Sequence, residues 1–268
     1  MTARHALRAL RALLSRELLR FLKQRGRFFA ALVRPLLWLL IFGAGFRAAI
    51  DLPVLPPYDA VVPYELYILP GLIGMVQLFN GMQSSLSMVY DREMGSMRVL
   101  LTTPLPRPLL LTGKILAGVA VSMVQVYAFL LIAAVFGIRL PPWGYLSLFP
   151  ALILSGLLLG ALGLLLSSLV RQLENFSGIM NFVIFPAFFL SSALYPLANL
   201  RSSSELLALL CLLNPFTYVV EMLRFAAYSQ IDPPALAVVL ATGAVTLAAA
   251  FWSYDPARWQ TRGGPPAA

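Results

Sequence analysis

The chain has 268 residues, of which 60% are hydrophobic and 12% are charged, and its formal net charge is +9. Soluble domains typically have about 25% charged and about 45–50% apolar residues, so this composition excludes an ordinary soluble enzyme and a disordered tail and indicates a membrane protein. A single cysteine and a single histidine provide neither an internal disulfide nor a His/Cys cluster for a metal ion.

Residues 1–27 are the first predicted element, an amphipathic helix at the membrane surface. At 3.6 residues per turn, Leu10, Leu14 and Phe21 share one face, while Arg20 and Lys23 lie on the opposite face. We expect this helix to lie flat on the inner leaflet in contact with lipids. Two roles agree with this pattern: an elbow that links motion at the surface to the first span, and a topology anchor.

Six apolar runs approach or reach the roughly 20 residues that a helix needs to cross the hydrocarbon core. They predict an all-α membrane protein with six transmembrane helices in one domain, residues 1–268. The first run contains one charge, Arg34, whose side chain can extend toward the nearer interface. The predicted spans are residues 28–46, 66–89, 115–136, 148–170, 177–194 and 235–252.

The distribution of positive charge predicts that both termini are cytoplasmic. Arginine and lysine accumulate on the cytoplasmic side of membrane proteins. With the amino terminus inside, sixteen Lys and Arg residues fall on the cytoplasmic side and four on the other side. Topology therefore accounts for the positive charge, and no nucleic-acid partner is expected.

The second and fourth runs carry patterns of polar and small residues. In the second run, Gln77, Asn80 and Ser84 belong to a polar stripe, which either lines a path across the membrane or bonds neighbouring helices. The fourth run contains a small-residue seam with G-x-x-x-G, which permits close approach of two helices. The seam consists of Gly156, Gly160, Gly163 and Ser167.

Residues 91–104, between the second and third runs, predict a short cytoplasmic helix. Its apolar residues, from Met94 to Leu101, are spaced as one face, and prolines at positions 104, 106 and 108 prevent its continuation. The helix either docks into a groove of a partner protein or lies against lipid head groups. A charged rim beside the apolar face consists of Asp91, Arg92, Glu93 and Arg98.

Residues 195–234 form a predicted external region between the fifth and sixth runs. Its apolar stretch, 206–213, is about 12 Å long as a helix, too short to cross the membrane. We expect a re-entrant pair of helices with the turn at Asn214 and Pro215. Glu221 and Arg224 are three residues apart on a helix and are predicted to form a structural ion pair.

Several short motifs occur in order along nearly the whole chain. Together they resemble the permease subunits of ATP-binding cassette exporters of the second type, in particular those for nodulation factors and daunorubicin-like drugs. The motifs are Arg34-Pro-Leu-Leu-Trp-Leu-Leu-Ile-Phe-Gly43, Tyr67-Ile-Leu-Pro-Gly71, Asp91-Arg-Glu-x-Gly95, Leu100-Leu101-x-x-Pro104, Gly113-Lys114, and Leu213-Asn214-Pro215-x-Thr217-Tyr218 with Glu221 and Arg224.

The resemblance implies a half-transporter of the inner (plasma) membrane, in which two copies of the chain pair with two ATP-binding subunits. ATP and Mg²⁺ then belong to the partner subunit, so this chain needs no cofactor and is not an enzyme alone. Its sequence has no G-x-x-x-x-G-K-[ST] phosphate loop. By the same resemblance, residues 91–104 are the coupling helix that receives the movement of the ATP-binding subunit. The implied coupling residues are Asp91, Arg92, Glu93, Gly95, Arg98, Leu100, Leu101 and Pro104.

The predicted function is ATP-driven export of an amphipathic solute, such as a drug, a lipid-linked molecule or a glycoconjugate. Two alternatives stay open: a gradient-driven secondary transporter, and a membrane scaffold in an ABC complex for cofactor or haem maturation. Coupling to an ion gradient without an ATPase partner would identify the first alternative. The predicted residues of the path or of the helix interfaces are Gln77, Asn80, Ser84, Asn214, Pro215, Glu221 and Arg224.

Overall fold

The computed structural model describes residues 3–23, 25–46, 56–93, 107–170 and 173–254. Within these ranges all regular structure is helical and no strand occurs, which confirms the predicted all-α class. The helices are α1 (Ala3–Lys23), α2 (Arg25–Phe46), α3 (Tyr64–Glu93), α5 (Arg107–Val135), α6 (Gly144–Leu169), α7 (Leu173–Phe189), α8 (Leu197–Ser203), α9 (Glu205–Leu213), α10 (Pro215–Ala227) and α11 (Pro233–Ser253).

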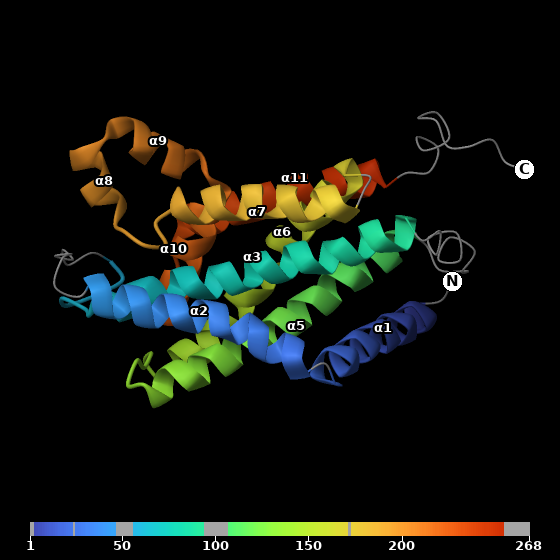
Figure 1. Ribbon diagram of the computed structural model, residues 1–268, viewed down its shortest axis with the longest axis horizontal. Coiled ribbons are helices and arrows are strands. Elements are labelled where there is room, and N and C mark those ends of the chain that lie inside the picture. Colours follow the sequence, from blue (N-terminus) through green and yellow to red (C-terminus); the bar gives the residue numbers. More distant parts are fainter. Residues whose placement is uncertain (1–2, 24, 47–55, 94–106, 171–172, 255–268) are drawn as a thin grey trace, which may run out of the picture.

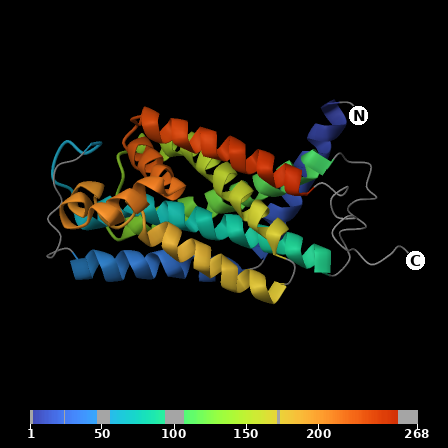
Figure 2. The same cartoon turned by 90° about the horizontal axis from the view of Figure 1, so that it is seen from above.

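Helix α3 lies at the centre of the bundle. It packs against α2, α5, α6, α7 and α10, and its residues Ile68, Leu72 and Ile73 are completely buried. The long helices run lengthwise through the molecule, and α1 lies obliquely at one end, against α5 (Figures 1 and 2). Helix α11 covers α6 and α10 on the far side of the bundle from α2.

Each of the six predicted spans coincides with a long helix. By length and hydropathy, three described helices can cross a membrane, namely α5, α6 and α11. A fourth candidate is the pair α9 and α10, which meet at 79°, and α2 contributes a shorter apolar stretch, Ala31–Gly43. The membrane-spanning roles of α2, α3 and α7 therefore remain predictions, and so does the total of six spans.

Several helix ends differ from the predicted ends. Helix α3 continues through Asp91 to Glu93, and α5 begins at Arg107, eight residues before the predicted start. Hydropathy carries no signal for a helix that continues past the apolar run into polar sequence. Helix α7 ends at Phe189 rather than 194. There the Ser191 hydroxyl donates to the Phe188 carbonyl and accepts from the Ala193 N–H, and such local bonds compete with the helix.

A close helix contact in the core joins α3 and α6. A Cβ atom built on Gly81 would lie 2.7 Å from the Leu159 carbonyl oxygen, and one on Gly163 would lie 2.6 Å from the Gly81 carbonyl oxygen. The two backbones therefore touch, as predicted for the small-residue seam of the fourth run. Gly156 and Gly160 of the same seam instead face Val119 and Ile115 of α5.

Replacing Gly81 by alanine is expected to destabilise the protein by about 1–3 kcal/mol, because the added methyl group overlaps backbone that cannot move aside. The measurement is the melting temperature of the purified protein in mild detergent. Gly178→Ala in α7 is the matched control, because a Cβ atom there meets nothing within 4 Å. Equal melting temperatures for the two variants would contradict the backbone contact between α3 and α6.

Candidate functional site

Three groups of polar side chains lie in or at the surface of the apolar bundle. We name them the inner seam, between α3, α5 and α6; the Arg34 cavity, between α2, α3 and α5; and the outer arginine cluster, around Arg224 of α10. In the described part of the chain, no three His, Cys, Asp or Glu side chains gather as they would around a metal ion. The three groups therefore offer hydrogen bonds and charge rather than metal ligands.

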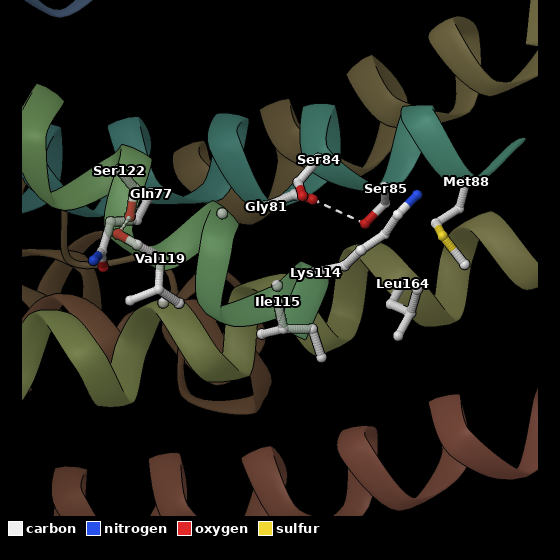
Figure 3. A pocket seen from close by; sticks show the side chains of 13 residues that line it. Gln77, Gly81, Ser84, Ser85, Met88, Lys114, Ile115, Val119, Ser122 and Leu164 are labelled. Atoms are coloured by element: carbon white, nitrogen blue, oxygen red, sulfur yellow. Dashed lines mark hydrogen bonds between the residues drawn. The ribbon is translucent and has the colours of Figure 1, made fainter. Parts of the chain in front are cut away.

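The inner seam is a narrow gap in which polar side chains join helices (Figure 3). The Gln77 side chain donates to the Leu152 carbonyl at 2.7 Å, and the Ser155 hydroxyl donates to the Gln77 side-chain oxygen. Gln77 thus bonds α3 to α6, one of the two predicted roles of the polar stripe. The gap has a volume of about 10 Å³, which is about the room for one water molecule.

Two further residues of the seam lie nearer the carboxyl end of α3. Ser84, half-buried, faces Gly118 of α5. The Lys114 ammonium of α5 donates to the Ser87 hydroxyl of α3 at 3.3 Å (Figure 3 shows Lys114 extending along the seam). The inner seam is therefore an interface between helices and is too narrow for an organic solute.

The Arg34 cavity is wider, with a volume of about 140 Å³. The Arg34 side chain is exposed, and its guanidinium lies over the Phe79 ring, 3.9 Å from its centre. Asn80 donates to the Val76 carbonyl at 2.9 Å and to the Gln125 side-chain oxygen of α5. The lining consists of Ala31, Arg34, Pro35, Met75, Val76, Phe79, Asn80, Gln83 and Gln125.

The outer arginine cluster holds a buried cation with three different partners. Arg224, which is only 3% exposed, pairs with Glu221 at 2.5 Å and donates to the Ser192 carbonyl at 2.8 Å. Its guanidinium also lies 4.2 Å from the centre of the Tyr67 ring. The predicted Glu221–Arg224 ion pair is confirmed, and it joins α10 to α3 and to the turn after α7.

A tyrosine from the loop before α3 completes this cluster. The Tyr58 ring lies 6.3 Å from the Tyr67 ring and 5.0 Å from the Tyr228 ring. Burial raises the pKa of the Tyr58 hydroxyl to about 12, although the nearby positive charge of Arg224 opposes the shift. The Tyr58 hydroxyl therefore stays neutral into the alkaline range and adds no negative charge beside Arg224.

Asn214 and Pro215 form the break between α9 and α10, at the predicted position. The Asn214 side-chain oxygen accepts from the Phe216 N–H at 3.0 Å and caps α10, while Pro215 occupies the first turn of this helix. The Asn214 amide also donates to the Ala187 and Leu190 carbonyls at 2.7 and 2.6 Å. Asn214 thus fixes the bent pair to the end of α7.

The predicted coupling residues fall mostly outside the described residues. Asp91, Arg92 and Glu93 are the last residues of α3, and their side chains are not described. Gly95, Arg98, Leu100, Leu101 and Pro104 lie outside the described ranges altogether. Their role in coupling stays a prediction.

The contacts of Arg224 with Tyr67 and Ser192, and the Arg34 cavity, were not predicted from the sequence. Tyr67 and Ser192 lie far from Arg224 in the chain, and no local spacing connects them. Arg34 and Gln125 are isolated polar residues in two different apolar runs. An isolated polar residue in an apolar run was the only indication of the Arg34 cavity in the sequence.

Charged and amide side chains enclosed among long apolar helices define a polytopic membrane protein of the transport type. The chain belongs to the ABC-2 type transporter family, whose model matches residues 8–228. This match confirms the resemblance to permeases of the second type. The protein is thus a multi-pass membrane subunit of an ABC transporter.

Similar proteins carry permease names. A "Putative transport permease ycf38" of Cyanophora paradoxa is 30% identical over 203 residues, which are 73% of this chain and 66% of the relative. Its namesake in Porphyra purpurea is 29% identical over 225 residues, 82% of this chain and 74% of the relative. The "Probable multidrug ABC transporter permease YbhR" of Escherichia coli (strain K12) is 32% identical over 146 residues, 53% of this chain and 39% of the relative. The chain thus spans slightly less than two thirds of the Cyanophora relative.

Replacing Glu221 by glutamine is expected to lower the free energy of unfolding by about 3 kcal/mol, because the buried Arg224 cation loses its carboxylate. For a chain of this size such a loss lowers the melting temperature by roughly 6–12 °C. Glu205→Gln, at an exposed position of α9, is the control and should change the melting temperature little. A Glu221→Gln protein as stable as the control would show that the ion pair is not structural.

Proposed function

We propose that this chain is the membrane subunit of an ATP-driven exporter that moves an amphipathic solute out of the cytoplasm, powered by a separate ATP-binding subunit. The family match over residues 8–228 carries the proposal, because it extends from the amino-terminal helix through the region of Glu221 and Arg224. The name of the Escherichia coli relative, a probable multidrug ABC transporter permease, supports a drug or another amphipathic molecule as the solute.

The proposed membrane topology has six spans, an interfacial α1, an external re-entrant pair of α9 and α10, and both termini in the cytoplasm of the inner membrane. The arrangement of helix ends supports it. Helix α1 begins, α3 ends, α5 begins and α11 ends at the same end of the bundle, whereas α8 and α9 lie at the other end (Figure 1). The excess of Lys and Arg in the segments at the first end favours a cytoplasmic location for that end.

The proposed coupling element is residues 91–104, which follow the carboxyl end of the central helix α3. Two copies of the chain form the transporter, and each coupling element contacts one ATP-binding subunit. Closure of these subunits on ATP brings the two coupling elements together and turns the helices attached through residues 104–108. Because α3 packs against five other helices, its movement is transmitted through the whole bundle and changes access to a path between the two copies.

The two alternative functions differ from this proposal in their partners and products. A gradient-driven carrier needs no ATPase subunit. A scaffold for cofactor or haem maturation binds an ATPase but moves no amphipathic solute. Both are distinguished from an exporter by the measurements below.

Purification of the tagged chain from its native membrane in mild detergent is expected to recover an ATP-binding subunit in stoichiometric amount. Mass spectrometry identifies the partner, and an ATPase assay measures the complex. Glu93→Ala and Gly95→Leu should reduce drug-stimulated ATPase activity several-fold and leave membrane insertion unchanged. Asp59→Ala, an exposed carboxylate in the loop before α3, is the control and should behave as the unchanged protein.

Two results would speak against the exporter, and one would speak against the coupling role alone. A well-folded chain that repeatedly purifies alone favours the gradient-driven carrier. Normal drug export by Glu93→Ala and Gly95→Leu contradicts the coupling role. An ATPase partner in cells whose drug resistance is the same with and without the chain favours the scaffold.

The proposed topology predicts which exposed positions a membrane-impermeant thiol reagent reaches in intact cells. In a Cys211→Ser background, Asp59→Cys should be labelled, and Glu174→Cys at the start of α7 should be labelled only after the cells are opened. Both positions are exposed in the bundle, so access differs only by the side of the membrane. Labelling of Glu174→Cys in intact cells would reverse the orientation.

A further inference from the structure

The Arg34 cavity contains a cation that has no counterion among the described residues. Arg34 is the tenth of the 22 residues of α2, so it lies about 14 Å along a helix about 33 Å long. The guanidinium carries five N–H donors, and among the described residues it forms no hydrogen bond and no ion pair. The Phe79 ring covers one face of the guanidinium and leaves its N–H edge available.

No acidic side chain lines this cavity in the described part of the chain. Arg34 is exposed at the mouth of the cavity, whereas Arg224 is buried and has Glu221. An anion that enters the cavity can therefore pair with the exposed Arg34 guanidinium, for which the cavity lining supplies no carboxylate.

Amide groups around the cation add directional donors. Gln125 is 1% exposed; its side-chain oxygen accepts from Asn80, while its side-chain nitrogen donates to none of the described residues. Gln83 lies exposed at the rim. Arg34 and these two amides thus present N–H groups from three helices, as recognition of an oxyanion requires.

The cavity also provides room for a head group and an apolar surface for a chain. Its volume of about 140 Å³ is close to that of an apolar cavity of about 150 Å³ that binds benzene, and a phosphate group has fewer heavy atoms than benzene. Met75 and Val76 form the buried floor. On α2, Leu37 and Ile41 follow Arg34 at i+3 and i+7 on the same helix face and are 49% and 63% exposed.

We propose that the Arg34 cavity binds an amphiphile with an anionic head group, a phosphate or a carboxylate, whose apolar chain lies along Leu37 and Ile41. The Arg34 guanidinium pairs with the head group, and Gln125 and Gln83 donate hydrogen bonds to its oxygens. The binding site rests on the geometry of the cavity, and only the role of its ligand as the transported solute rests on the proposed exporter function. A membrane phospholipid and an exported solute share this chemistry.

Binding of dodecyl phosphate to the purified full-length chain in dodecyl maltoside tests the proposal without the ATP-binding subunit. We expect Arg34→Gln to weaken binding at least 10-fold and Arg34→Lys to weaken it less, because lysine keeps the charge but lacks the guanidinium fork. Gln125→Leu should also weaken binding. Arg201→Gln, which removes one positive charge at an exposed position of α8, should leave the affinity unchanged.

The head group and the chain are tested by three further probes. Dodecanoate should compete with dodecyl phosphate, dodecyltrimethylammonium should not, and inorganic phosphate should compete only weakly because it lacks the chain. Equal affinity of the unchanged protein and Arg34→Gln, with equal melting temperatures, would overturn the proposal. If Arg34→Gln does not fold, equal affinity of Arg34→Lys, Gln125→Leu and the unchanged protein would overturn it.

The source of the head group is decided by lipid analysis of the same preparations. A phospholipid retained by the unchanged protein and lost from Arg34→Gln assigns the site to bilayer lipid. Dodecyl phosphate binding to protein free of retained phospholipid assigns it to a solute. Failure to recover an ATP-binding subunit would contradict the exporter and would leave this binding result standing.

Discussion

The contact between the backbones of α3 and α6 at Gly81 and Gly163 is the constraint on which the rest of the bundle depends. Because no side chain separates the helices there, Gln77, one turn earlier on α3, reaches the Leu152 carbonyl and the Ser155 hydroxyl. With α6 this close, the remaining faces of α3 are available to α2, α5, α7 and α10. One short contact between small residues thus determines how the central helix meets its neighbours.

The buried Arg224 and the half-buried Asn214 have partners within the protein, because losing contact with water is costly for an unpaired polar group. Arg224 has a carboxylate, a carbonyl and an aromatic ring as partners, and each polar atom of the Asn214 side chain has a backbone partner. These side chains hold α7, α9 and α10 together. Among the described residues Arg34 has the Phe79 ring as its partner, and both Arg34 and Gln83 are exposed where the cavity opens. The Arg224 and Asn214 contacts hold helices together, and Arg34 marks the cavity where binding is proposed.

Local chemistry explains which features of the fold were predictable. The Glu221–Arg224 pair follows from i, i+3 spacing on one helix, and the break at Asn214 follows from the proline after it. The ends of α3 and α5 were predicted less well, because both helices extend beyond their apolar runs. The early end of α7 depends on hydroxyl bonds of Ser191, which hydropathy does not record.

The sequence by itself determined the all-helical class, the apolar segments, the ion pair on α10 and the resemblance to the ABC-2 type permeases. Only the tertiary structure decided that Gln77 bonds α3 to α6, that Tyr67 covers Arg224, and that Arg34, Phe79 and Gln125 surround one cavity. The reason is physical. Periodicity defines the apolar face of a single helix, whereas the rotation and depth at which two helices meet depend on how their side chains fit together.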